Sequence, residues 1–137
     1  MSIILRLDSD CRLTAILGRI NAERHSRAIQ GQLPEGVPNQ IVWYQSRSDK
    51  QIVRPPLLDR FHGPKIGEVY VHNYVSEGKD TAQIWLFQGP KLGWSDVSDG
   101  FLSDSVQISH PLTNTRILVR YLGRGFEPSY ILRKSRK

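Results

Sequence analysis

Residues suited to catalysis or metal binding are few and scattered along this chain. The chain has four histidines, His25, His62, His72 and His110. None of them has a second His or a Cys at the short spacing that a metal site needs. The single cysteine, Cys11, stands between Asp10 and Arg12, and no neighbour would make its thiol reactive. We therefore expect no bound metal, no cofactor and no catalytic thiol.

Phosphate-binding and nucleophile motifs are also missing from the sequence. Gly123-Arg124-Gly125 leads into Phe126-Glu127-Pro128, so no helix N-terminus follows the glycines to receive a phosphate. There is no Gly-x-Ser-x-Gly nucleophile elbow. These absences favour a protein without enzymatic activity and without a small-molecule substrate.

Basic residues are concentrated near the C-terminal end. Residues 1–115 carry twelve Lys and Arg and twelve Asp and Glu, so the net charge of +6 comes from residues 116–137. The basic residues there are Arg116, Arg120, Arg124, Arg133, Lys134, Arg136 and Lys137. This asymmetry predicts a basic surface that faces nucleic acid or an acidic protein. The alternative is a C-terminal strand and tail whose charges serve solubility.

The alternation of residues 116–122 predicts how this surface is built. Side chains alternate between the two faces of a strand, so Ile117, Val119 and Tyr121 are expected to enter the core. Arg116 and Arg120 would then lie together on the outer face. If residues 129–133 pair with this strand, Arg133 would join them.

A second candidate binding surface is aromatic. Its residues are Tyr70, Tyr74, Trp85, Phe87 and Trp94. An exposed aromatic platform can stack on bases or sugar rings. The more common role of such residues is to form the core.

The elements that position these residues are mostly predicted strands. Residues 67–75 and 81–88 both alternate between two faces and are joined by a polar loop at 76–80, which predicts a β-hairpin followed by an arm at 94–97. Residues 40–45 and 51–54 predict another hairpin around 46–50. Residues 55–66 are expected to be irregular. Further strands are predicted at 105–109, 116–122 and 129–133.

The N-terminal part of the chain predicts a strand followed by a helix. Residues 2–7 are apolar and β-branched, which favours a strand. Leu13, Ile16, Leu17 and Ile20 follow helical spacing, and a helix from about residue 12 could continue to Gln30, before Gly31. Residues 31–39 hold two Pro and two Gly, which indicates a loop.

Together these elements predict a mainly β fold, an antiparallel β-sandwich or small barrel with one N-terminal helix. The length of 137 residues suits one domain, which we place at residues 1–132 with a basic tail at 133–137. No secretory signal is evident, and no apolar stretch approaches the ~20 residues that span a bilayer, so no membrane partner is expected. One cysteine fits a reducing compartment, so the expected location is cytoplasmic.

Two segments carry a resemblance to a known group of proteins. Ser2-Ile3-Ile4-Leu5-Arg6, followed by Leu13-Thr14, is similar to the N-termini of tail-fibre and tail-associated proteins of tailed bacteriophages. Gly67-Glu68-Val69-Tyr70-Val71, with Ile84-Trp85, Gly89 and Trp94, resembles a hairpin of phage tail and fibre proteins.

This resemblance implies a virion structural protein: a subunit of a tail, baseplate, fibre attachment or neck. Such a protein would be assembled in the host cytoplasm, be present in several copies and dock onto other virion proteins. It would have no catalytic residues. The alternative hypothesis is a small nucleic-acid-binding β domain that uses Arg116, Arg120, Arg124 and the basic tail.

Overall fold

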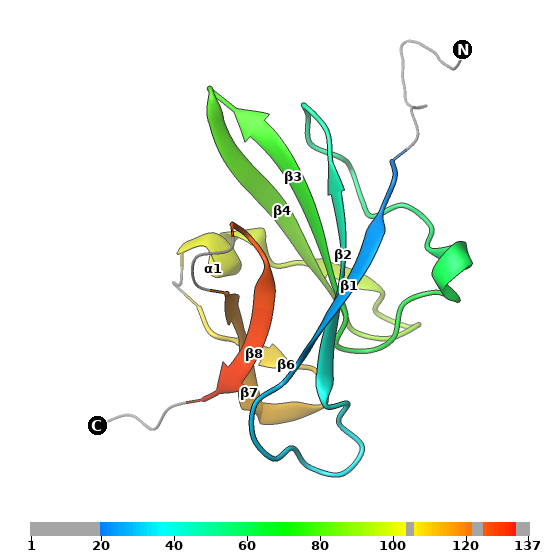
Figure 1. Ribbon diagram of the computed structural model, residues 1–137, viewed down its shortest axis with the longest axis vertical. Helices are drawn as coiled ribbons and strands as arrows, with labels where there is room; N and C mark the ends of the chain where they lie inside the picture. The colour runs from blue at the N-terminus through cyan, green and yellow to red at the C-terminus, as the bar shows by residue number, and fades with distance from the viewer. Residues whose placement is uncertain (1–19, 104–105, 122–124, 134–137) are drawn as a thin grey trace.

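The described part of the chain folds into two β-sheets and one short α-helix (Figure 1). The computed structural model describes residues 20–103, 106–121 and 125–133. The first sheet has the order β1-β2-β3-β4-β5, with strands Glu23–Ala28, Gln40–Arg47, Val69–Ser76, Lys79–Phe87 and Trp94–Asp96. The second has the order β6-β7-β8, with strands Ile108–His110, Thr113–Arg120 and Pro128–Leu132. The 3₁₀ helix η1 is Asp59–Phe61, and α1 is Ser98–Ser103.

The prediction of a mainly β fold is confirmed. Of the two predicted architectures, a β-sandwich and a small barrel, the structure is closer to the sandwich. Across the described residues the two sheets remain separate and do not close into a barrel. The predicted hairpin exists as β3 and β4, which pair antiparallel with Tyr70 opposite Trp85. Its turn is tighter than the predicted five-residue loop, because the strands extend to Ser76 and Lys79.

The predicted hairpin of residues 40–54 is wrong. β2 pairs antiparallel with β1 and parallel with β3, and residues 51–54 form no strand. The Gln83 side chain instead binds both backbone groups of Ile52, accepting its N–H and donating to its carbonyl at 2.8 Å each. One side chain thus replaces the ladder that a second strand would have supplied.

The predicted N-terminal helix is wrong from residue 20 onward, because residues 20–22 form no helix and β1 occupies Glu23–Ala28. The earlier part of that helix, up to residue 19, and the predicted strand 2–7 lie outside the described residues. β1 holds mostly polar side chains and is stabilised by its pairing with β2. The helical spacing ends at Ile20, and nothing in residues 23–28 continues it.

The second sheet follows the prediction with shifted bounds. β7 pairs antiparallel with β6 and with β8, and Leu118 lies opposite Tyr130. In Figure 1, β8 lies beside the lower part of β1, and α1 lies near the upper end of β8.

Both faces of the five-stranded sheet are covered. One face packs Trp43, Val69 and Ile84 against Phe101 of α1 and the second sheet. The other face packs Tyr44, Tyr70 and Trp85 against Leu58, in the long connection from β2 to β3. The consecutive burial of Val69, Tyr70, Val71, His72 and Asn73 follows from this arrangement, since a strand with two covered faces has no solvent-facing side.

Candidate docking groove

The predicted aromatic surface belongs largely to the core. Tyr70 is fully buried, and its ring meets Trp85 and Trp94 edge-on, with centroids 6.2 and 6.1 Å apart. Phe87 contacts Trp94 in the same geometry. Tyr74 is partly exposed, and its hydroxyl accepts a hydrogen bond from Gln51. These contacts make the rings a packing cluster rather than a platform for bases or sugars.

The arrangement nearest to a catalytic one is a buried relay beneath the β2–β3 connection. His72 Nε2 lies 2.8 Å from the Lys50 carbonyl, which can only accept, so this nitrogen carries the proton. Burial lowers the pKa of His72, so the ring is neutral and its Nδ1 accepts from Ser46 at 2.8 Å. Ser46 in turn accepts from the Tyr70 hydroxyl. Ser48 Oγ also lies 2.9 Å from His72 Nε2 and donates to the Lys50 carbonyl. Ser46 and His72 are buried and Ser48 is partly exposed, so the relay fastens the connection to the sheet.

Three buried tyrosines also donate hydrogen bonds that hold the fold together. Tyr44 donates to Glu68 at 2.8 Å, and burial together with that carboxylate raises the pKa of Tyr44 to about 12. Burial also raises the pKa of Tyr70 to about 12. Tyr130 donates to the Gly67 carbonyl at 2.7 Å, and burial raises its pKa above the usual range. All three phenols therefore act as hydrogen-bond donors near neutral pH.

The predicted pairing of Arg116 with Arg120 on the outer face is wrong. Arg116 is only 2% exposed, and Leu118 on the same face enters the core, so the even-numbered residues of β7 point inward at this end. Arg116 donates to the Gln32 carbonyl at 3.1 Å. Tyr121, predicted to be buried, is 37% exposed.

Two other arginines of the predicted basic surface bind groups of their own chain. Arg120 donates to the Gly125 carbonyl, and its guanidinium lies 4.3 Å from the Phe126 ring centroid. Arg133 donates to the Asn114 carbonyl at 2.7 Å and to the side chains of Gln107 and Ser109. The remaining basic candidates, Arg124, Lys134, Arg136 and Lys137, lie outside the described residues.

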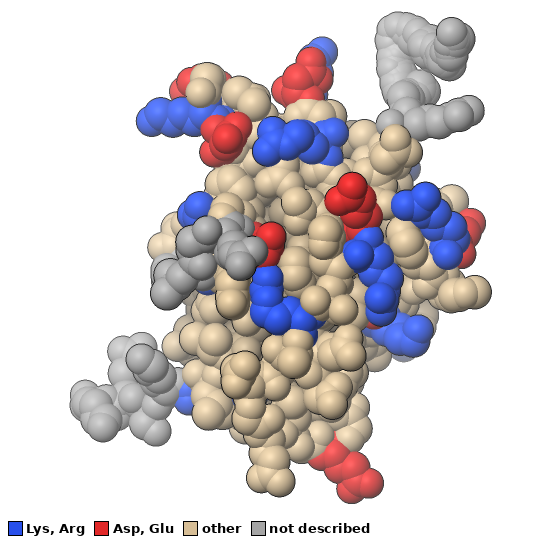
Figure 2. Space-filling view, viewed as in Figure 1, with Lys and Arg blue, Asp and Glu red and all other residues tan. Residues whose placement is uncertain are grey.

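The visible face of the molecule carries its charges in separate groups. In Figure 2, blue Lys and Arg side chains lie mostly beside red Asp and Glu, and the lower part of this face is largely uncharged. Proteins that bind nucleic acid often have a continuous basic stripe that follows the phosphate backbone. The charges on this face do not form such a stripe.

A groove of about 1320 Å³ lies between β1 and β8, the facing edges of the two sheets. From the first sheet it is lined by Arg27, Ala28, Gln30 and Gly31. From α1 and the second sheet it is lined by Phe101, Leu102, Arg116, Val119, Arg120, Tyr121, Gly125 and Ser129–Leu132. Several of its apolar side chains remain substantially exposed: Leu102, Tyr121, Ile131 and Leu132.

Arg27 joins the two edges at the start of β8. Its guanidinium donates to Glu127 at 2.6 Å and to the Pro128 carbonyl at 2.9 Å. It also lies 3.7 Å from the ring centroid of Tyr121 and 4.7 Å from that of Trp43. This side chain fixes the separation of the sheets at one end and leaves the groove open beyond it.

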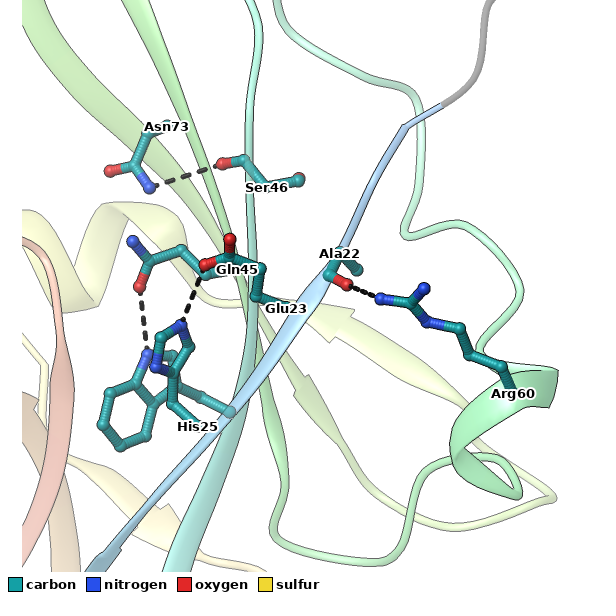
Figure 3. Close-up of polar contacts among 8 residues, drawn as sticks. Ala22, Glu23, His25, Gln45, Ser46, Arg60 and Asn73 are labelled. Carbon is teal, nitrogen blue, oxygen red and sulfur yellow. Dashed lines mark hydrogen bonds and ion pairs between the residues drawn. The ribbon is translucent and has the colours of Figure 1, made fainter.

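The free backbone edge of β8 follows from its register. Arg133 N–H donates to Thr115, and Tyr121 N–H donates to Glu127, so the odd-numbered residues of β8 bond with β7. The N–H and carbonyl groups of Tyr130 and Leu132 therefore point away from β7, toward the groove. By the same logic, the carbonyl of Ala22, just before β1, points outward and accepts from Arg60 at 2.6 Å, as Figure 3 shows.

β8 differs from the other edge strands of the described residues. β1 carries Glu23, Arg24 and Arg27, and charged side chains discourage edge-to-edge pairing. β5 and β6 have three residues each, and short edges discourage pairing too. β8 has five residues and no charge, with Ile131 40% and Leu132 59% exposed. It is the edge best suited to pair with another strand.

The sequence does not reveal this groove, because the pattern of residues 129–133 predicts a strand but not which edge of a sheet that strand forms. The available signal was the uncharged run 128–132 amid basic residues.

Within the described residues no cluster of His, Cys, Asp and Glu could hold a metal ion, and no helix is both long and apolar enough to cross a membrane. Comparison with protein-family models, curated proteins and solved structures finds no match to this chain.

Proposed function

We propose that this protein is a non-catalytic structural and assembly protein that docks onto other subunits through the open edge of β8. The setting that we propose is the virion of a tailed phage, in a tail, baseplate, fibre attachment or neck, after assembly in the host cytoplasm. The virion setting is supported by the residues similar to phage tail and fibre proteins. The docking role is supported by the groove.

The observation that carries the docking role is the combination of free backbone groups and exposed apolar side chains on β8. Adding a strand to an edge gains main-chain hydrogen bonds, while neighbouring pockets select side chains. Leu132, which is 59% exposed, offers the accessible backbone groups, since Tyr130 is only 3% exposed. Ile131, Leu102 and Tyr121 offer apolar surface. Natural proteins usually protect such an edge. On β8 Pro128 and its contact with Arg27 protect the start of the strand, which leaves its far end for a partner.

The test is self-association of the full chain, measured by size-exclusion chromatography with light scattering over a range of concentrations. Ile131→Lys places a charge on the β8 edge and should weaken association at least about tenfold, since lysine blocks edge pairing. The matched control is Val53→Lys, because Val53 is also β-branched and is 88% exposed on the β2–β3 connection. It should associate like the unmodified chain.

Both variants should keep the unmodified circular dichroism spectrum and unfolding midpoint, because both positions are exposed. A chain that stays monomeric at every concentration would contradict the proposal. So would equal loss of association in the two variants, because that result would place the interface away from β8.

A nucleic-acid-binding domain is the second candidate, and the described arginines do not favour it. Arg116 is buried, and Arg120 and Arg133 bind backbone and side-chain groups of their own chain. A phosphate would have to displace these contacts before it could be bound. The candidate therefore depends on Arg124 and the tail.

A further inference from the structure

Arg116 is a buried cation without a counter-ion among the described residues. Its side chain lines the groove, and its Nε–H is buried with no hydrogen-bond partner. Its recorded hydrogen bond goes to a neutral carbonyl, that of Gln32. Arginine is almost never fully buried unless it is paired, since an uncompensated charge is costly away from water. The groove therefore has a place for a carboxylate.

The position of this cation along β8 sets the order of groups that an occupant must have. Arg116 lies opposite Leu132, at the end of β8, whereas Arg27 meets Pro128 at its start. An extended occupant running parallel to β8 would pass Tyr130 and Ile131 first and reach Arg116 last. An occupant in this parallel direction would therefore carry apolar residues followed by an acid, and one in the antiparallel direction would carry them in the reverse order.

One segment of this chain has the parallel order. Residues 2–10, which lie outside the described part of the structure, read Ser-Ile-Ile-Leu-Arg-Leu-Asp-Ser-Asp. The apolar, β-branched run favours an extended strand, and Asp8 follows it directly. With Asp8 opposite Leu132, Leu7 falls opposite Ile131, Arg6 opposite Tyr130 and Ile4 opposite Pro128, so the segment matches the length of β8 and includes one basic residue.

We propose that residues 2–10 of a second copy occupy the groove, add to the free edge of β8 and place the Asp8 carboxylate against Arg116. This inference rests on the proposed function, because it names the partner segment for the same edge. Exchange of one segment between identical copies lets every subunit both donate and receive a strand. The pairing of a buried arginine with a carboxylate also makes the docking selective for an acidic segment.

The experiment traps the contact between two different full-length copies. One protein carries Cys11→Ser with Leu7→Cys, and an affinity tag distinguishes it from the second, which carries Cys11→Ser with Ile131→Cys. Each copy has a single thiol, so a mixed disulfide can form only between copies. After mixing and mild oxidation, the tagged–untagged dimer is quantified on a non-reducing gel.

The control partner carries Cys11→Ser with Val53→Cys, since Val53 is exposed and away from the groove. The Ile131→Cys partner should trap Leu7→Cys at least about tenfold more than this control. Adding Asp8→Asn to the Leu7→Cys copy should reduce trapping at least about tenfold, as expected when one member of a buried charge pair is neutralised. This substitution leaves the buried Arg116 unchanged, so misfolding of the core does not enter the result.

Trapping that is equal at Val53, or that ignores Asp8→Asn, would overturn the inference. The two proposals can fail separately. Self-association that depends on Ile131 without trapping at Leu7 would keep the docking edge and reject residues 2–10 as its occupant. Absence of self-association would reject the docking function itself.

Discussion

At the scale of single residues, two buried histidines link the stability of the fold to pH. His72 bridges Ser46 and the Lys50 carbonyl, and His110 accepts from the Leu112 N–H while packing on Tyr130 at 4.4 Å. Burial lowers the pKa of both rings below 6.5. Each ring uses Nδ1 as an acceptor, and protonation would turn that acceptor into a donor.

The sign of the pH effect follows from these lowered pKa values. Below pH 6.5 the unfolded chain binds protons that the folded chain does not, so the free energy of unfolding decreases as the pH falls. We expect full stability above that pH, with a slope below it of at most about 1.4 kcal/mol per pH unit for each histidine. Urea unfolding at about pH 7.5 and about pH 5.5 measures it.

Substitutions assign this slope to its residues. His72→Gln should flatten the pH dependence, because it removes one of the two buried rings whose pKa is lowered. The same profile in the unmodified chain and in His72→Gln would count against the proposed contribution of the relay.

Sequence reasoning failed at the residue scale where two faces of a strand look alike. Ile117 and Leu118 are adjacent and apolar, so alternation in residues 116–122 allows either face to be the core. The prediction chose Ile117, Val119 and Tyr121. Ile117 is indeed buried, but the fold buries Arg116 and Leu118 more deeply and leaves Tyr121 exposed. A buried arginine overrides the general rule that charges face water, and this exception marks the groove.

At the scale of elements, the tight turn between β3 and β4 provides the clearest prediction. Its two residues, Glu77 and Gly78, both have positive φ, at 51° and 77°. Such a turn prefers Asn or Asp followed by Gly, since a glutamate is strained in the left-handed region. Glu77→Asn should raise the free energy of unfolding by about 0.5–1 kcal/mol.

Chemical denaturation measures this effect, with Glu35→Asn as the control. Glu35 is exposed in a loop and is not among the described non-glycine residues with positive φ. The control should leave stability nearly unchanged. A Glu77→Asn variant no more stable than the control would argue against strain in this turn.

The hairpin was predictable because its pairing is local and both arms alternate. The β1–β2–β3 arrangement was not, because parallel pairing of β2 with β3 joins residues separated by a long connection. Residues 51–54 look like a strand in isolation. Ile52 nevertheless bonds to the Gln83 side chain, a long-range contact that no local pattern records.

At the scale of the whole molecule, the distribution of charge separates assembly from nucleic-acid binding. The net charge of +6 comes from the C-terminal end, yet the described arginines there are bound within the fold. We therefore expect Arg120→Ala and Arg133→Ala to act on stability. Each removes hydrogen bonds to neighbouring groups, which should cost about 0.5–1.5 kcal/mol.

The same variants should leave binding to DNA and RNA unchanged. Fluorescence anisotropy with labelled generic DNA and RNA, at about 50 and about 200 mM salt, compares them with the unmodified chain. If these arginines contacted phosphates, each substitution would weaken binding at low salt and reduce its salt dependence by about one unit of slope. That result would show that the C-terminal arginines bind nucleic acid and do not only stabilise the fold. Unchanged binding would leave the β8 edge as the leading interaction surface.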